Sequence, residues 1–305
     1  MIHKNKNQFI DVINIMVQRT GFRAPLLEKD YYVTLILSRV HELSDDLILK
    51  GGTCLNKIYY SYSRLSEDLD FSMRLPEYTT NRGNRRKPEG RGLASDSQSH
   101  KSIKPVKDKI EDFAKQLDMR IDGAEIAGRN ESKQYIYYFA YKSVIQPAEQ
   151  MIKFEIGLRF NPICPIEKKT VQHKFLHPFT KEPLFDTGKV NCLSLKEIVS
   201  EKLRAAALRE VIAPRDFYDL DFILRHNFNL SDKEVMELFK KKIAEDGANT
   251  DLSKYRINLG RTDVEIKDMR SRIEEELFDV LTPDEQEKFK LDTALVRINK
   301  AMVNV

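Results

Sequence analysis

The chain has 305 residues, of which 41% are hydrophobic and 32% are charged, and its formal net charge is +4. This length favours two domains, since single cores rarely grow beyond about 250–300 residues, and a nearly balanced charge does not by itself require a polyanionic partner. No run approaches the roughly 20 apolar residues of a membrane span, so we expect no membrane association.

The first part of the chain alternates between helical and strand-like patterns. Apolar residues at helical spacing and a proline near a helix start predict two helices before position 40. A short apolar strand then runs directly into two glycines, and an alternating segment follows. The predicted elements are helices over 7–20, from Pro25 to about 40 and from 54 to about 60, and strands over 47–50 and 65–73.

Residues 76–106 are rich in glycine and arginine and predict a long loop, with nine basic residues against three acids between positions 82 and 109. A helix is expected over 105–118, and β-prone runs at 135–141 and 151–158 favour an antiparallel pair of strands. From Ser194 the pattern becomes helical, and Ser194 with Glu197 fits a capping box. Further helices are predicted over 215–225, 232–245 and 264–303.

These elements predict an α/β (α+β) fold in which helices flank a mixed central sheet and a helical domain follows. We expect a first domain over residues 1–190 and a second over 191–305. The three cysteines at positions 54, 164 and 192 suit neither a disulfide framework nor a zinc site. Since no apolar run follows the basic N-terminus, we expect a reduced, cytoplasmic protein.

Two carboxylates two positions apart are the first candidate site. On a strand, Asp68 and Asp70 point to the same face, whereas Leu69 and Phe71 face the other side. Paired carboxylates can converge on a hard cation such as Mg²⁺ or Mn²⁺. A solvated strand edge with two aspartates explains the same pattern, so this pair alone does not decide the function.

A glycine pair and a third acid add to this candidate. Gly51, Gly52 and Thr53 lie between an apolar strand and a helix, where backbone amides and a hydroxyl can cradle phosphate. Glu155 lies on a later strand and could complete a carboxylate triad or act as general base. A tight turn and a surface acid are the alternatives.

The segments Lys50–Lys57 and Arg64–Ser72 together resemble the first motif of the AbiEii-type nucleotidyltransferase toxins, a branch of the DNA polymerase β-like nucleotidyltransferase superfamily. The segments 27–33, 194–205 and 214–220 also resemble this family, in the same order along the chain. The resemblance implies the nucleotidyltransferase fold, with a second domain that contributes side chains to the catalytic cleft.

The resemblance also implies roles for particular residues. Asp68 and Asp70, with Glu155 as third carboxylate, would bind the metal. The triphosphate of an NTP would be bound by Gly51, Gly52, Thr53, Ser66 and Lys202. Asp216 would be a further catalytic acid, with Asp219 as the less favoured candidate. A salt bridge between Arg215 and Asp219 competes with that catalytic role.

The implied activity is metal-dependent transfer of NMP from an NTP to an acceptor hydroxyl, by a toxin of a toxin–antitoxin or abortive-infection system. The implied acceptor is the 3′ end of tRNA, and a cognate antitoxin is an expected partner. Basic residues of the loop over 76–106 and strand tyrosines at 135–141 are candidate RNA contacts, although such tyrosines more often pack in a core. Transfer to a protein hydroxyl and a noncatalytic nucleic-acid-binding module remain alternatives.

Overall fold

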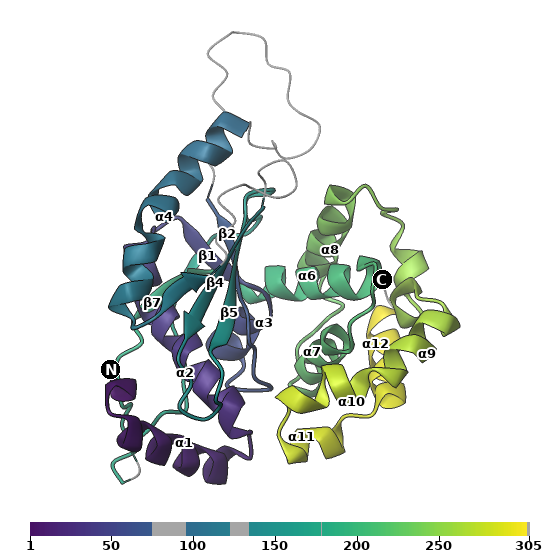
Figure 1. Cartoon of the computed structure of the whole chain (residues 1–305). Coiled ribbons are helices and arrows are strands. Elements are labelled where there is room, and N and C mark those ends of the chain that lie inside the picture. The colour runs from purple at the N-terminus through teal and green to yellow at the C-terminus, as the bar shows by residue number, and fades with distance from the viewer. Residues whose placement is uncertain (75–95, 123–133, 178, 304–305) are drawn as a thin grey trace. The chain divides into compact units, whose positions relative to one another are not determined.

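The computed structural model describes residues 1–74, 96–122, 134–177 and 179–303. It divides into two compact units, the first made of Met1–Ser61 and Ser66–Leu193 (Figure 1). The second unit consists of Tyr62–Leu65 together with the chain from Ser194 onward. The short segment Tyr62–Leu65 therefore belongs to the second unit, although it interrupts the sequence of the first.

The first unit contains a seven-stranded sheet and helices on its surface. Its strands are ordered β3-β4-β5-β2-β1-β7-β6, with parallel and antiparallel pairs. The helices are α1 (Lys6–Thr20), α2 (Ala24–Arg39), α3 (Gly51–Cys54) continued by a π-helical turn (Leu55–Tyr59), and α4 (Asp96–Gln116). The strands are β1 (Leu47–Lys50), β2 (Leu69–Met73), β3 (Arg120–Asp122), β4 (Gln134–Tyr141), β5 (Gln150–Gly157), β6 (Glu167–Thr170) and β7 (Lys189–Cys192).

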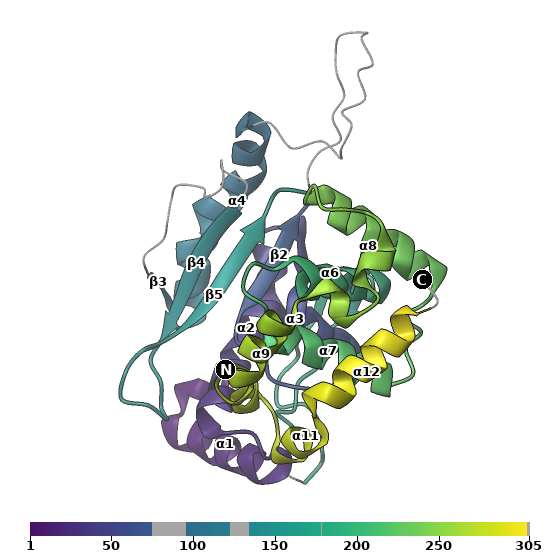
Figure 2. The same cartoon turned by 90° about the vertical axis from the view of Figure 1, so that its right-hand side faces the viewer.

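The centre of the sheet has one apolar face. Leu69 and Phe71 of β2 and Phe154 of β5 are fully buried on this face, as strict alternation along a strand requires. Two helices pack on it: Tyr32 of α2 stacks on Tyr141 of β4 with ring centroids 4.0 Å apart. Phe113 of α4 meets Phe139 of β4 edge-on. Figure 2 shows α4 lying along the sheet beside β3 and β4.

The second unit is helical, as the sequence predicts. Its helices are α6 (Leu195–Leu208), α7 (Pro214–Arg225), α8 (Lys233–Glu245), α9 (Asp263–Ser271), α10 (Ile273–Glu276), α11 (Pro283–Lys288) and α12 (Leu291–Met302). The side chain of Ser194 caps α6 by accepting a hydrogen bond from Glu197 N. Helix α6 packs on α7 and α8, and α7 also packs on α12 (Figure 2). The predicted α/β fold, with a mixed sheet followed by helices, is confirmed.

Three details differ from the expectations. Strand β2 begins at Leu69 rather than at 65, and β3 was not predicted. Helix α4 begins at Asp96, inside the segment predicted as a loop. Its side chains at 103, 106 and 110 are buried, and this helical spacing holds the helix on the sheet through Pro105. The rest of the predicted basic loop, residues 76–95, lies outside the described residues.

The strand tyrosines belong mainly to the core. Tyr135, Tyr137 and Tyr141 are at most 2% exposed, because their positions on β4 place them on the apolar face. Packing in the core, which the sequence favoured over stacking on RNA bases, is therefore confirmed for these three tyrosines. Tyr138 is half-buried.

Helix α2 carries two acids in its first half that are buried in the structure. Glu28 accepts hydrogen bonds from Ser143 Oγ (2.5 Å) and from Val144 N (2.6 Å). Asp30 lies 2.6 Å from Lys57 Nζ, and both residues are 2% exposed. These contacts tie α2 to the strand connection after β4 and to the helical segment after Gly51.

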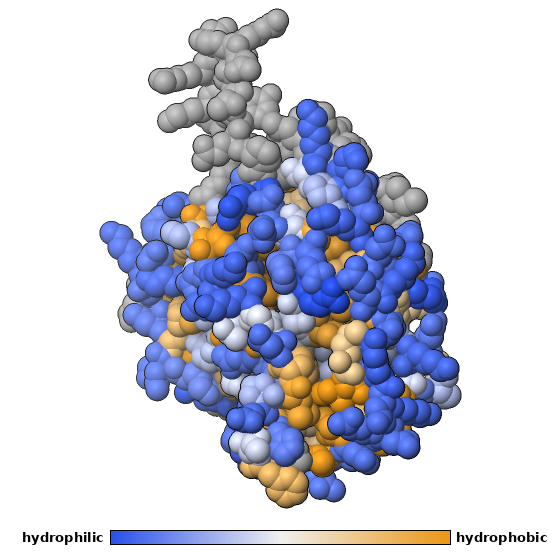
Figure 3. All heavy atoms as spheres, turned by 90° about the vertical axis from the view of Figure 1, so that its left-hand side faces the viewer, coloured by the Kyte–Doolittle hydropathy of each residue, from blue (hydrophilic) through white to orange (hydrophobic). Residues whose placement is uncertain are grey.

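The face drawn in Figure 3 is covered largely by hydrophilic side chains, with apolar ones gathered in smaller patches. Within the described ranges, no helix combines the length and the apolar character needed to cross a bilayer.

Candidate active site

Three charged residues stand side by side on the polar face of the sheet. Lys50, at the end of β1, pairs with Asp70 of β2, and Asp70 pairs with Glu155 of β5. Neighbouring strands lie about 4.8 Å apart, so register alone brings the two carboxylates together although 85 positions separate them (155 − 70). We call Lys50, Asp70 and Glu155 the charged row.

Asp70 lies at the centre of this charged row and is half-buried. Burial raises the pKa of its carboxyl above the ordinary value, and the carboxylates of Glu155 and Asp68 act in the same direction. The ammonium of Lys50 opposes them and lowers this pKa, but does not outweigh the burial. Burial, more than the neighbouring charges, therefore disfavours the ionised form of Asp70.

Glu155 is held by two neighbours. Its carboxylate accepts hydrogen bonds from Lys153 Nζ (2.5 Å) and from Gln134 Nε2 (2.7 Å). Burial acts to raise the pKa of Glu155, but the bond to Lys153 and its charge outweigh it, and the pKa is lowered. Glu155 is thus ionised at neutral pH.

The glycine pair and the acids are joined by direct contacts. Gly51 has φ +70°, and a Cβ atom at this position would lie 2.6 Å from Asp70 Oδ2. Thr53 is fully buried; its hydroxyl donates to the backbone carbonyl of Asp68 and lies 2.8 Å from Ser66 Oγ. We expected this hydroxyl to contact phosphate, but it is occupied inside the protein, where it fixes the segment that precedes β2.

The chemistry of the acids suits a divalent metal, but the three carboxylates are not gathered around one point. In the part of the chain that the structure describes, no group of three or more His, Cys, Asp or Glu side chains is placed to hold a metal ion. Glu155 turns to Lys153 and Gln134 instead. Oxygen donors and the raised pKa of Asp70 nevertheless fit a hard cation, which would favour the ionised carboxylate.

A second cluster of charges lies within the helical unit. Lys202 Nζ on α6 lies 2.9 Å from Asp216 Oδ1 and 2.7 Å from Asp219 Oδ2, both on α7. Arg64 donates two hydrogen bonds, of 2.8 and 3.1 Å, to the carboxylate of Asp219. The alternative pair Arg215–Asp219 is not formed, because Arg64 and Lys202 occupy both oxygens of Asp219.

The two acids of this cluster, Asp216 and Asp219, differ in how many of their carboxylate oxygens already accept hydrogen bonds. Burial alone would raise the pKa of Asp219, but Arg64 and Lys202 outweigh it and lower the pKa to about 2. Asp216 binds Lys202 through Oδ1, while its Oδ2 accepts no hydrogen bond among the described residues and lies 3.3 Å from Arg209 Nε. Asp219 is therefore a structural acid, and Asp216 keeps one oxygen with spare capacity.

Comparison with known families gives the decisive observation. The model of the Nucleotidyl transferase AbiEii toxin family, Type IV TA system, matches residues 35–295. The chain belongs to this AbiEii family. No curated protein matches it.

Two solved structures share the fold of this AbiEii chain. MenT4, a nucleotidyltransferase toxin from Mycobacterium tuberculosis, is 16% identical with a TM-score of 0.52, and the match covers 92% of each chain. The crystal structure of JHP933 from Helicobacter pylori is 15% identical with a TM-score of 0.51, and the match covers 92% of this chain and 91% of that one. At these identities the likeness concerns the fold alone.

Some residues of the candidate site were not predicted from the sequence. Lys50 and Gly157 became candidates only when the strand register was known, as did Lys153 and Gln134. The alternation along 153–157 indicates that Lys153 and Glu155 share a face of their strand. No pattern in the sequence near Lys50 indicates that this lysine lies on the same face of the sheet.

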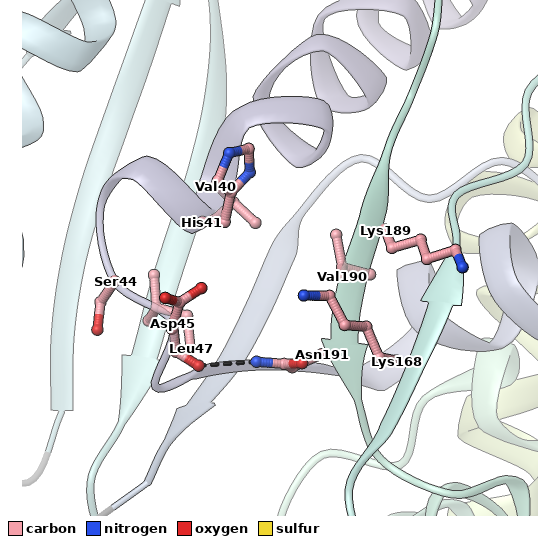
Figure 4. A pocket seen from close by; sticks show the side chains of 9 residues that line it. All are labelled: Val40, His41, Ser44, Asp45, Leu47, Lys168, Lys189, Val190 and Asn191. Atoms are coloured by element: carbon pink, nitrogen blue, oxygen red, sulfur yellow. Dashed lines mark hydrogen bonds between the residues drawn. The ribbon is translucent and has the colours of Figure 1, made fainter.

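A surface pocket lies at the other end of β1 in this AbiEii chain. It has a volume of about 300 Å³ and is lined by residues of the turn before β1 and of β6 and β7, among them Asp45, Lys168 and Lys189 (Figure 4). Asn191 closes one side by donating to the backbone carbonyl of Asp45. The pocket adjoins Leu47, whereas the charged row begins at Lys50, so the two are separate places on the first unit.

Proposed function

We propose that this chain is a metal-dependent nucleotidyltransferase that transfers NMP from an NTP to the 3′ end of tRNA, and that it acts as the toxin of a toxin–antitoxin pair. The observation that carries this proposal is the register of β1, β2 and β5. It sets Asp70 beside Glu155 and brings Gly51 against the carboxylate of Asp70, which supports binding of metal and phosphate next to Asp70.

The proposed roles follow the chemistry of each group. Asp68 and Asp70 would hold Mg²⁺ or Mn²⁺, with Glu155 as third carboxylate and general base. When bound, the metal would neutralise charge on the phosphates and activate the acceptor hydroxyl. The protein's own contribution is mainly positioning and charge stabilisation.

The triphosphate has donors on the first unit and candidates on the second. Backbone N–H groups of Gly51, Gly52 and Thr53 open a helical segment and can donate to phosphate, and the hydroxyl of Ser66 adds a donor. From the second unit we propose Lys202 as a phosphate ligand and Asp216 as the further acid. The spare oxygen of Asp216 and the two cations on Asp219 support this choice between the acids.

Labelled transfer tests the proposal directly. The purified protein is incubated with each of the four α-labelled NTPs, MgCl₂ and total tRNA, and label is expected in tRNA. Asp70→Asn, Asp68→Asn and chelation of the metal should each remove it, because each removes negative charge or metal from the same place. Circular dichroism of the two variants verifies that they are folded.

Other outcomes contradict the proposal in identifiable ways. Label on protein and none on RNA would replace the acceptor with a protein hydroxyl. RNA binding without transfer of any nucleotide would leave a noncatalytic nucleic-acid-binding module. Full transfer by Asp70→Asn would show that the site lies elsewhere.

A further inference from the structure

Strand β1 ends with Lys50, a lysine that forms no salt bridge with the described acids of the sheet. Lys50 pairs in register with Asp70, yet within the described residues no carboxylate lies within the 4 Å of a salt bridge to its ammonium. The neighbouring Lys153, on the same face two strands away, is in contact with Glu155 at 2.5 Å. Of the two lysines beside the acids, Lys50 is the uncommitted one.

The position of this ammonium is set by the strand on the far side of β2. A Cβ atom at Gly157 of β5 would lie 3.7 Å from Lys50 Nζ. The side chain of Lys50 therefore extends over β2 towards β5, above the strand that carries Asp70. Glycine at 157 leaves this space open. Lys50 is a half-buried residue next to the two acids of the charged row, and no salt bridge among the described residues joins it to either acid.

We propose that Lys50 is a phosphate-binding residue of the nucleotide site: its ammonium, held over Gly157, binds an oxygen of the triphosphate while Asp70 faces the metal. This inference rests on the proposed function, because it needs a nucleoside triphosphate at the charged row. A lysine ammonium is a compact charge with three donors and suits non-bridging phosphate oxygens. Lys50 also directly precedes Gly51, so its ammonium and the backbone N–H groups that begin at Gly51 can bind the same triphosphate.

The arrangement distinguishes phosphate binding from mere neutralisation of the acids. An ammonium that neutralises a carboxylate is most stabilised in direct contact with it, as Lys153 is with Glu155. Lys50 makes no such contact with Asp70. The absence of that contact in the described residues leaves the donors of Lys50 available for a ligand that arrives with its own negative charge.

Binding measurements test this role without relying on turnover. The full chain is titrated with fluorescent derivatives of the four NTPs and of the matching nucleosides, with Ca²⁺ in place of Mg²⁺ to prevent turnover. Lys50→Met should weaken binding of the preferred triphosphate about 10- to 100-fold, the range of one charge-assisted hydrogen bond, and leave nucleoside binding unchanged. Lys189→Met, an exposed strand lysine on β7, is the matched control and should bind like wild type.

A second pair of variants probes the same contact from the opposite side. Gly157→Ala adds a methyl group at an ordinary van der Waals distance of 3.7 Å from Lys50 Nζ and should bind the triphosphate almost normally. Gly157→Val fills the space of the ammonium and should reproduce the loss seen in Lys50→Met. This pair decides the question if Lys50→Met does not fold.

The outcomes separate the two levels of the proposal. If wild type binds no nucleotide, the proposed function and this inference both fail. If wild type binds a triphosphate and Lys50→Met and Gly157→Val bind it equally well, only the role of Lys50 is overturned. Equal losses of triphosphate and nucleoside affinity would likewise overturn it, since they indicate a general distortion of the site.

Discussion

At the scale of single residues, the candidate site depends on close approaches that only particular side chains allow. Gly51 has a left-handed backbone and no Cβ, which lets Asp70 Oδ2 lie where a methyl group would otherwise be. Asp219 is ionised although fully buried, because two cations contact it. Each of these features leads to a substitution with a defined result.

Gly51→Ala is expected to reduce transfer at least tenfold and to destabilise the chain by about 1–2 kcal/mol or more. Left-handed backbone costs about that much for a residue with a Cβ, and the new methyl group displaces the carboxylate of Asp70. Gly247→Ala is a matched control, since Gly247 has the same φ of +70° with nothing within 4 Å of the added atom. Transfer rates and urea unfolding measure both; equal loss of activity in the two variants would contradict the clash with Asp70.

Asp219→Asn is expected to destabilise the helical unit by about 3–5 kcal/mol at pH 7, because it leaves the buried Arg64 without its carboxylate and Lys202 with Asp216 alone. The pKa of Asp219 is lowered from 3.8 to about 2 on folding. Its stabilisation is therefore complete above about pH 4 and is lost as the pH falls towards 2. Urea unfolding at pH 7 and at pH 3 should show a smaller difference from wild type at the lower pH.

Asp216→Asn serves as the comparison for Asp219→Asn. Its other partner, Arg209, has a side chain that is 53% exposed, so water can replace the lost contact and the loss of stability should be smaller. An Asp216→Asn variant that is less stable than Asp219→Asn would reverse our assignment of the structural acid.

At the scale of elements, helix α2 is fixed by buried charge as well as by apolar packing. The pair Asp30–Lys57 joins α2 to the π-helical turn that follows α3, and Thr34 Oγ1 accepts a further bond from Lys57 at 2.8 Å. Burial lowers the pKa of Lys57, and Asp30 opposes this change. The helical segment that begins with the glycine pair is therefore held to α2 by this charge pair. Because both side chains are buried, water cannot replace either partner.

Lys57→Met is expected to destabilise the chain by about 3–5 kcal/mol, because it removes the ammonium that lies 2.6 Å from the buried carboxylate of Asp30. The double variant Asp30→Asn with Lys57→Met removes both charges and should recover much of that loss. Urea unfolding of wild type, both single variants and the double variant gives the coupling energy. Losses that simply add would show that the two side chains do not act as a pair.

At the scale of the whole molecule, the chain order and the structural units do not coincide. Tyr62–Leu65 lies between the glycine pair and the acids in sequence, but it is part of the helical unit. There the Tyr218 hydroxyl donates to Ser63 O at 2.6 Å, and Leu65 N donates to Val280 O at 2.9 Å. The loop between the two motifs is thus built into the packing of the second unit.

Arg64→Met should loosen the helical unit selectively, since Arg64 binds Asp219 from this inserted segment. Hydrogen exchange is expected to speed up in α7, while amides of β4 and β5 keep their protection. Arg270→Met is the control: its exposed pair with Asp292 should be worth about 1 kcal/mol or less. Faster exchange in the sheet alone would contradict the assignment of this segment to the second unit.

The sequence by itself determined the order of the elements, the positions of Gly51-Gly52 and Asp68–Asp70, and the family. Helical spacing, strand alternation and motif order are local properties, and they need no knowledge of distant contacts. Local pattern also had limits: it missed the first turns of α4, before Pro105, in which Ile103 is buried.

Only the tertiary structure decided which side chains meet. Lys50, Asp70 and Glu155 come together because β2 pairs with β1 on one side and with β5 on the other, and strand register between distant segments is set by packing of the whole apolar face. The same holds for Arg64 and Asp219, which are 155 positions apart. A sequence specifies such contacts through the sum of many weak preferences, so no single motif reveals them.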